Sequence, residues 1–90
     1  MLNPVYTNTF SKDIKRAKKR HKNLDKLKAI IETLLQGSEL PTSARDHKLV
    51  GNYKGRRECH IEPDWLLIYQ IIKDAIIFER CGSHADLFSE

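Results

Sequence analysis

The sequence predicts an α+β fold with the element order β-α-α-β-β-β, in which a small, mainly antiparallel sheet packs against an α-helical hairpin. Two observations predict it. Apolar residues recur at helical spacing up to about residue 35, and from about residue 48 they alternate or form continuous runs. Helices first and strands later, with short connections, are typical of two helices lying on one face of a sheet. The 90 residues are expected to form a single domain, 1–90.

The first half of the chain predicts one short strand and two helices. Residues 4–8 include the strand-favouring pair Val5 and Tyr6. One helix is expected from about residue 9 to 20, and the next from Asn23, a favourable N-cap, to a stop at Gly37. Both carry one apolar stripe, made by Phe10, Ile14 and Ala17 and then by Leu24, Leu27, Ile31 and Leu34. A connection of only two or three residues makes the two helices an antiparallel hairpin.

The second half predicts three strands. Residues 48–53 form a short candidate strand that Gly51 interrupts. Residues 56–62 alternate, with Arg56, Glu58, His60 and Glu62 on one face and Arg57, Cys59 and Ile61 on the other. Residues 65–72 are almost all apolar, which suits a central strand covered on both faces. Residues 75–81 form the last strand, and residues 83–88 are expected to form a short tail.

Basic residues gather in the predicted helical hairpin. Residues 12–28 carry nine Lys or Arg against two Asp, whereas the whole chain has a net charge of only +4. Such a field attracts polyanions, so we expect Lys15, Lys18 and Lys19 to contact nucleic acid or a ribosome surface. A solvated helix face is the alternative. Membrane binding is not expected, because the apolar stripe of this helix is needed for the core and no apolar run is long enough to span a bilayer.

Other features favour a soluble cytoplasmic protein. Two cysteines are too few for a secreted disulfide framework, and the N-terminal residues do not read as a signal peptide.

Three of the four histidines lie where side chains can converge across the predicted sheet. His47 precedes a strand, His60 lies on one, and His84 follows the last one, whereas His21 lies in the basic hairpin and is expected at the surface. Asp64, Trp65 and Phe88 lie close to these histidines in the sequence.

These residue types suit the cleavage of RNA without a metal. The 2′-hydroxyl must lose a proton, the leaving 5′-oxygen must gain one, and the charge that develops at phosphorus needs stabilisation. Histidine titrates near working pH, a carboxylate can act as a base or orient an imidazole, and aromatic rings can stack on unpaired bases. Lys54, Arg56 and Arg57 lie nearby and could hold phosphate.

Two other interpretations remain open from the residues alone. Cys59, His60, Cys81 and His84 are of zinc-ligand type, although the adjacent Cys59 and His60 should point to opposite faces of one strand. A noncatalytic RNA- or ribosome-binding module would explain the basic helices. It would not explain why His, Asp and Trp gather in the less basic half.

Two strings of residues resemble the YafQ branch of the RelE/ParE toxin superfamily. They are H-x-E-P-D-W at residues 60–65 and G-x-H-x-x-L-F at residues 82–88. Shorter matches run along nearly the whole chain: Phe10-Ser11-Lys12-Asp13, Lys19-Arg20-His21-Lys22, Asp46-His47, Lys54-Gly55, Leu67-Ile68-Tyr69 and Phe78-Glu79-Arg80. The resemblance implies the RelE-like fold, a small sheet with an α-helical hairpin, which agrees with the element order predicted above.

The resemblance also implies an activity and partners. Members are mRNA interferases, the toxins of type II toxin–antitoxin pairs, which cut mRNA in the ribosomal A site and so inhibit translation. The implied partners are the ribosome, mRNA and a DinJ-type antitoxin, with operator DNA bound only through the antitoxin complex. No cofactor is implied.

The functional set of the family falls on the residues already singled out. By this resemblance His84 is the general acid, His60 or Asp64 handles the 2′-hydroxyl, and His47 assists. Trp65 and Phe88 are implied to pack on bases or to support the site.

Two residues depart from the pattern of the branch. Arg56 shares the His60 face, so codon preference is not carried over, and Cys59 should face away from the site. ParE relatives share the fold but poison gyrase, and the histidines favour the nuclease instead.

Overall fold

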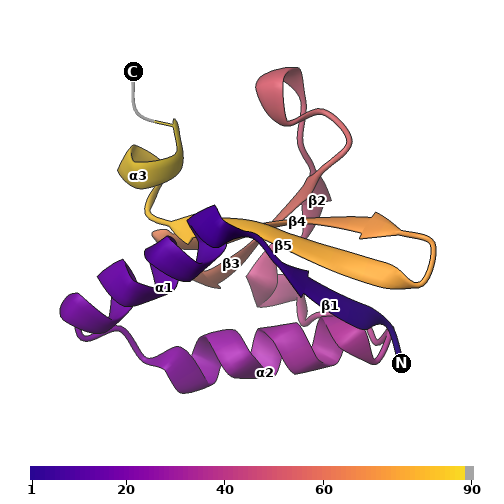
Figure 1. The fold of residues 1–90 in the computed structure, drawn as a ribbon, viewed down its shortest axis with the longest axis horizontal. Helices are drawn as coiled ribbons and strands as arrows, with labels where there is room; N and C mark the ends of the chain where they lie inside the picture. The colour runs from indigo at the N-terminus through magenta and orange to yellow at the C-terminus, as the bar shows by residue number, and fades with distance from the viewer. Residues whose placement is uncertain (89–90) are drawn as a thin grey trace.

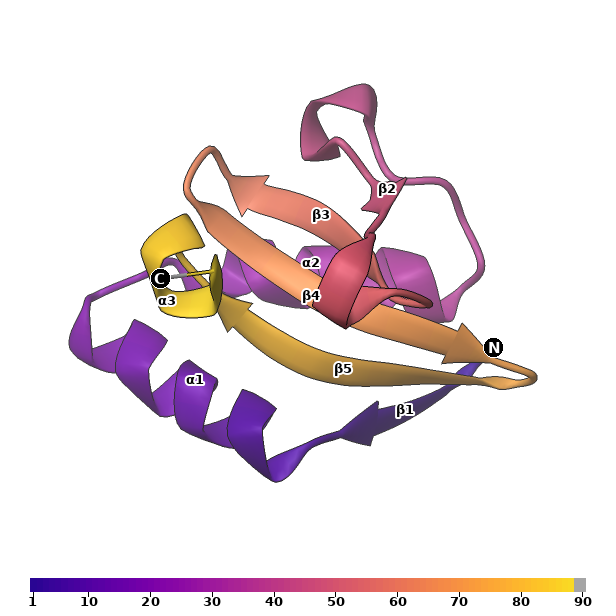
Figure 2. The ribbon, with the colours of Figure 1, turned by 90° about the horizontal axis from the view of Figure 1, so that it is seen from above.

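A five-stranded sheet with the order β1-β5-β4-β3-β2 forms the middle layer of the computed structural model, which describes residues 1–88 (Figures 1 and 2). Its strands are β1 (Asn3–Tyr6), β2 (His47–Lys48), β3 (Arg57–Glu62), β4 (Trp65–Ile72) and β5 (Ala75–Gly82). β1 pairs with β5 in parallel and every other pair is antiparallel. The predicted α+β class with a mainly antiparallel sheet is therefore confirmed.

Two helices cover one face of this sheet, here called the inner face (Figure 1). They are α1 (Asn8–Lys19) and α2 (Leu24–Leu35). The side chain of Thr7 caps α1 by accepting the Phe10 N–H at 3.0 Å, so β1 ends two residues earlier than predicted. Asn23 caps α2 as predicted, and Gly37 follows that helix with a φ of +71°, a left-handed conformation that glycine adopts without strain.

The core depends on β4, the central strand, which is covered on both faces as predicted. Trp65, Leu67 and Tyr69 pack against the helices on the inner face. Leu66 and Ile68 alternate with them and are equally buried on the outer face, beneath Leu87 and the segment around Tyr53. This double coverage explains why the strand reads as an unbroken apolar run.

The prediction of a strand over residues 48–53 was wrong. Only His47–Lys48 pair with β3, and Gly51–Tyr53 form a 3₁₀ turn, η2, on the outer face. Gly51 takes a φ of +72°, a left-handed conformation that ends extended backbone. A second 3₁₀ turn, η1 (Thr42–Ala44), precedes β2.

The predicted tail is instead a short helix, α3 (His84–Phe88), on the outer face (Figure 2). Ser83 and Asp86 cap its first turn reciprocally: the Ser83 N–H donates to the Asp86 carboxylate at 2.9 Å, and the Asp86 N–H donates to the Ser83 hydroxyl at 3.1 Å. This S-x-x-D pattern is a capping box, which is a helix-start signal present in the sequence.

The predicted alternation in β3 fails at its last residue. The pairing of β3 with β4 shifts register between His60 and Glu62. A bulge of this kind adds one residue and turns the following side chain to the other face. Glu62 therefore bonds Lys22 at 3.1 Å and Lys26 at 3.2 Å on the helical side, instead of sharing the face of His60.

Helix α1 packs along the edge of the sheet beyond the end of β1. Among residues 1–88, no strand pairs with this edge of β5 beyond Phe78, and α1 lies beside it (Figure 2). The Asp13 carboxylate, 4% exposed, accepts the Cys81 N–H at 3.0 Å and the Arg80 Nε–H at 2.8 Å, and it also pairs with Arg16 at 2.9 Å. A buried carboxylate with this many donors is fully hydrogen-bonded.

Replacement of Asp13 by Ala should destabilise the fold strongly. The change leaves the Cys81 N–H without its acceptor and the Arg80 guanidinium without its counter-charge, and it removes the nearer of two carboxylates from Arg16, which costs about 3 kcal/mol of unfolding free energy. Urea unfolding followed by circular dichroism measures this loss. Asp74→Asn, in the exposed turn between β4 and β5, is the matched control and should change stability by less than about 0.5 kcal/mol. A similar effect of both variants would contradict the role of Asp13.

Candidate functional site

The outer face brings three histidines together from three different elements. His47 lies on β2, directly opposite Glu58 of β3, while His60 lies further along β3. His84 is the first residue of α3, and its ring lies 5.9 Å from the ring of His60. His21 is exposed in the connection between α1 and α2, as predicted, and takes no part.

A buried carboxylate joins two of these imidazoles. Glu58 is 5% exposed, and its Oε1 atom lies 3.5 Å from Nε2 of His47 and 3.6 Å from Nε2 of His60. The other ring nitrogen of each histidine faces a main-chain carbonyl, that of Arg45 at 2.7 Å and that of Pro63 at 3.3 Å. Because a carbonyl only accepts, these contacts select the tautomer with the proton on Nδ1, and Nε2 of each ring faces the carboxylate.

Sequence reasoning did not single out Glu58. A glutamate in an alternating strand is ordinarily a solvated residue. The available signal was its position on the same strand face as His60, two residues earlier.

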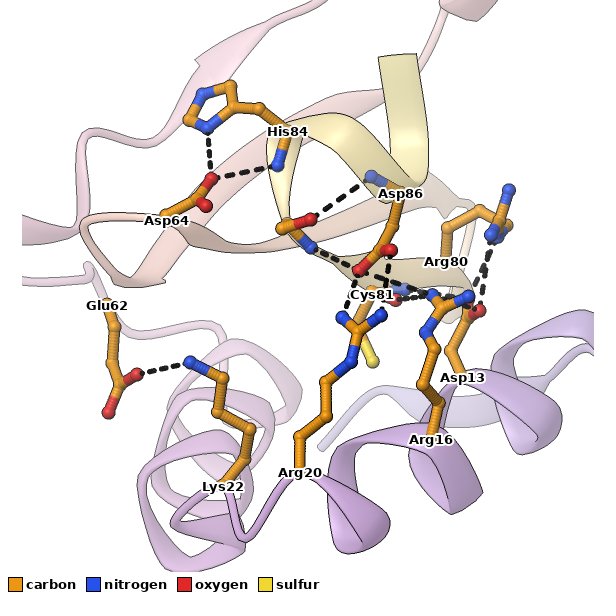
Figure 3. A network of polar contacts seen from close by, with 11 residues as sticks. Asp13, Arg16, Arg20, Lys22, Glu62, Asp64, Arg80, Cys81, His84 and Asp86 are labelled. Atoms are coloured by element: carbon orange, nitrogen blue, oxygen red, sulfur yellow. Dashed lines mark hydrogen bonds and ion pairs between the residues drawn. The ribbon is translucent and has the colours of Figure 1, made fainter. Parts of the chain in front are cut away.

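The third histidine is oriented by an aspartate. Asp64 Oδ1 accepts the His84 backbone N–H at 2.9 Å and lies 2.6 Å from the His84 Nδ1 atom (Figure 3). The backbone N–H first, and then the imidazole, lower the pKa of Asp64 below its ordinary value, so the carboxylate stays ionised at neutral pH. Within residues 1–88 the Nε2 atom of His84 has no hydrogen-bond partner, which leaves it free toward solvent.

The two aromatic candidates lie on opposite faces of the sheet. Phe88 is 37% exposed, packs edge-on against Tyr53 with ring centroids 5.6 Å apart, and lies 6.4 Å from the His84 ring. Trp65 is 2% exposed in the inner core, beneath the Lys22 ammonium. Its ring therefore has no free face on which a base could stack, and support of the site is the part of its expected role that fits this position.

The basic residues predicted to bind RNA or the ribosome lie in different parts of the structure. Lys54 is exposed at the end of η2, next to the Tyr53 ring that contacts Phe88. Arg57 points to the inner face, where it pairs with Asp46 at 3.2 Å, so the structure does not bring its guanidinium to the histidines. Arg56 pairs with Glu79 of β5 at 2.8 Å. Lys15, Lys18 and Lys19 are exposed along α1.

Both cysteines lie in the inner core. Burial raises the pKa of the Cys59 thiol and of the Cys81 thiol to about 12. Cys59 and His60 lie on opposite faces, as the strand period predicts. Among residues 1–88 no three His, Cys, Asp or Glu side chains are arranged to hold a metal ion, so the zinc interpretation lacks its ligand set.

Fold and site together define a small protein that presents three imidazoles and two carboxylates at one end of a sheet, with basic helices behind it. Over the same part of the chain no helix is long and apolar enough to cross a membrane. A family model described as the bacterial toxin of type II toxin–antitoxin system, YafQ, matches residues 2–89. The chain therefore belongs to the YafQ family of bacterial toxins.

Individual relatives agree with this assignment. The chain is 46% identical over 84 residues to the mRNA interferase toxin YafQ of Escherichia coli strain K12, covering 92% of this chain and 91% of that protein. The crystal structure of YafQ from E. coli strain BL21(DE3) matches with a TM-score of 0.93 at 43% identity, over 98% of this chain and 99% of that one. YafQ in a crystal structure of the E. coli DinJ–YafQ complex matches with a TM-score of 0.91 at 44% identity, over 98% and 99% of the two chains.

The contact between Asp64 and His84 predicts a measurable titration. In the native chain the pKa of Asp64 should lie below that of a free aspartate, because His84 stabilises its ionised form. His84→Ala removes the imidazole but keeps the backbone N–H, so the pKa should rise part of the way back. Carbon-13 NMR of the carboxyl groups measures both values. Glu62 is the internal control, because Lys22 and Lys26 lower its pKa and neither is changed. An Asp64 pKa that does not move would show that the imidazole is not its partner.

Proposed function

We propose that this chain is a ribosome-dependent endoribonuclease, an mRNA interferase that cuts mRNA in the ribosomal A site and so inhibits translation. The observation that carries the proposal is the Asp64–His84 pair, which leaves one imidazole nitrogen open to solvent beside His60. Membership of the YafQ family and likeness to an E. coli protein named an mRNA interferase support it. The proposed site needs no metal.

The chemistry uses the RNA's own 2′-hydroxyl as the nucleophile. A bond forms between the 2′-oxygen and phosphorus while the bond from phosphorus to the 5′-oxygen breaks, which leaves a 2′,3′-cyclic phosphate and a 5′-hydroxyl. One proton leaves the 2′-oxygen and one reaches the departing 5′-oxygen. Two groups that exchange protons near neutral pH are therefore required.

His84 is the general acid in this proposal. Asp64 accepts the Nδ1 proton, so the second proton of the imidazolium lies on Nε2, which faces solvent and the substrate. The Asp64 carboxylate stabilises the charged ring before the transfer. Since Asp64 is bonded to His84, it suits an orienting role better than that of a base.

His60 takes the proton from the 2′-hydroxyl. The buried Glu58 carboxylate stabilises the imidazolium that forms, and it does the same for His47, which assists at the transition state. The resulting positive charge opposes the charge that develops on phosphorus. Glu58 acts through the two histidines and is a positioning residue.

The surrounding residues bind the substrate. The exposed Phe88 ring stacks on a base, Lys54 holds a phosphate, and Trp65 supports the site from the core. A noncatalytic ribosome-binding module would use the basic helix equally well, but it would give the Asp64–His84 pair no task.

The proposal includes the partners of the system. Likeness to YafQ of the E. coli DinJ–YafQ complex supports a DinJ-like antitoxin that binds and silences this chain, with operator DNA contacted only through that complex. The ribosome places the site of action in the cytoplasm. Lys15, Lys18 and Lys19 on α1 supply the ribosome-binding face.

Replacement of His84 by Ala should abolish mRNA cleavage while the protein still folds and binds its antitoxin. Removal of a general acid lowers the rate by about 10²- to 10⁴-fold. The assay maps mRNA ends after incubation with programmed ribosomes. His21→Asn is the matched control, because Asn tolerates the φ of +58° at that exposed position. Cleavage by the His84 variant at the native rate would refute the acid assignment.

Charge reversal at Lys15, Lys18 and Lys19 should weaken ribosome binding and flatten its dependence on salt. Each phosphate contact that is lost reduces the slope of log affinity against log salt by about one. Ribosome pelleting at several salt concentrations measures both quantities. Lys73→Glu, in the turn between β4 and β5, is the control, and its slope should stay native. Unchanged binding by the triple variant would make this face a solvated surface only.

A further inference from the structure

Helix α3 carries the proposed general acid but is too short to hold itself in place. It has five residues, His84–Phe88, and an isolated helix of this length is not stable in water. Its one buried apolar side chain is Leu87, which packs on Leu66 and Ile68. The position of His84 therefore depends on what else ties the first turn of α3 to the rest of the molecule.

Asp86 bonds both within that first turn and to α1. Its Oδ2 atom accepts the Ser83 N–H at 2.9 Å, and its own N–H donates to the Ser83 hydroxyl. The Arg20 guanidinium grips the same carboxylate from α1, with Nη1 at 2.7 Å from Oδ2 and Nη2 at 3.3 Å from Oδ1 (Figure 3). Arg16 lies 3.7 Å away. The Asp86 side chain is only 13% exposed, although it belongs to a surface helix.

The packing around this carboxylate is tight. A Cβ atom at Gly82 would lie 2.9 Å from the Asp86 Cβ and 2.9 Å from Arg16 Nη2. Any side chain at residue 82 would push Asp86 and Arg16 apart, so glycine suits the point where β5 passes into α3. The Arg20 hydrogen bonds lower the pKa of Asp86, which keeps the carboxylate ionised over the working range of pH.

We propose that Asp86 is a positioning residue for His84, and that it acts by holding the first turn of α3 against Arg20 of α1. Asp86 fixes Ser83, the residue directly before His84, while Asp64 fixes the His84 N–H and imidazole from the other side. Asp64 thus holds the His84 imidazole directly, while Asp86 holds the turn of backbone from which His84 projects. This inference rests on the proposed function, because Asp86 has a positioning role only if His84 is catalytic.

Asp86→Asn separates the ion pair from the cap. An asparagine oxygen can still accept the Ser83 N–H, but the charge that holds Arg20 is lost. Since displacement of a reacting group by about 1 Å costs up to 10²-fold in rate, single-turnover cleavage of mRNA on saturating ribosomes should fall by about tenfold or more. Asp86→Glu keeps the charge and an S-x-x-E capping box, so it should recover most of the rate.

Two readouts distinguish positioning from a general loss of stability. The pKa of Asp64 should rise in Asp86→Asn, since His84 no longer stays on that carboxylate. Ribosome affinity should not weaken, because the substitution removes a negative charge and Asp86 has no proposed contact with RNA. Arg20→Gln and the double variant complete a cycle, and their rate losses should be markedly non-additive if the two residues act through one contact.

The controls keep the outcome unambiguous. Asp74→Asn removes one negative charge in the turn before β5, at the opposite end of that strand from α3, and should cleave at the native rate. Thermal unfolding checks that each variant is folded at the assay temperature, and if Asp86→Asn is not, Arg20→Gln carries the test. Native cleavage and a native Asp64 pKa in Asp86→Asn would overturn this inference while the proposed function stood. Native cleavage by His84→Ala would overturn the proposed function itself.

Discussion

The Asp13 carboxylate closes an edge of the sheet, and the geometry of the outer face depends on that closure. β1 is too short to pair with the whole of β5, so the backbone beyond Phe78 would be left open. An unpaired edge is costly when it is buried and invites pairing with other chains when it is not. Asp13 accepts the Cys81 N–H, and Thr7 donates its hydroxyl to the Glu79 carbonyl at 2.9 Å. These bonds fix the position of α1 beside β5. They therefore also fix the position of Arg20, which directly follows α1. Through Arg20 and Asp86, the same constraint extends to α3 and the His84 imidazole.

Local features of the sequence predicted most of the fold, and non-local pairs account for what it did not predict. Helical spacing, the Asn23 cap and the apolar run of β4 each lie within one element, so they can be read from neighbouring residues. The burial of Asp13 and of Glu58 depends on partners that arrive from elsewhere. Arg80 lies 67 residues from Asp13 along the chain, and no period in the sequence encodes that contact. The α3 helix is a different case, because its capping box is local but its five residues are too few for a periodic stripe.

The candidate site shows the same division. Strand ends predicted that His47, His60 and His84 could converge, since the ends of adjacent strands meet at one side of a sheet. The face taken by Trp65 could not be predicted, because both faces of β4 are apolar. Arg57 and Glu62 were placed by alternation, which holds for Arg57 and fails for Glu62 beyond the bulge. The carboxylate that joins His47 to His60 was visible only once β2 and β3 were paired in register.

The structure also changes the meaning of the positive charge on the helical hairpin. Four of the nine basic residues in 12–28 are paired with carboxylates: Arg16 with Asp13, Arg20 with Asp86, and Lys22 and Lys26 with Glu62. Arg16 binds Asp13 at the edge of β5, and Arg20 binds Asp86 on α3. A planar guanidinium with several donors suits such contacts. The three lysines of the exposed face, Lys15, Lys18 and Lys19, remain directed to solvent on α1. The field available to a polyanion is therefore weaker than the count suggests, and four of the five other basic residues lie on α1, with Lys28 on α2. The four paired residues instead stabilise the fold, and Arg20 does so through Asp86, on the helix that carries His84.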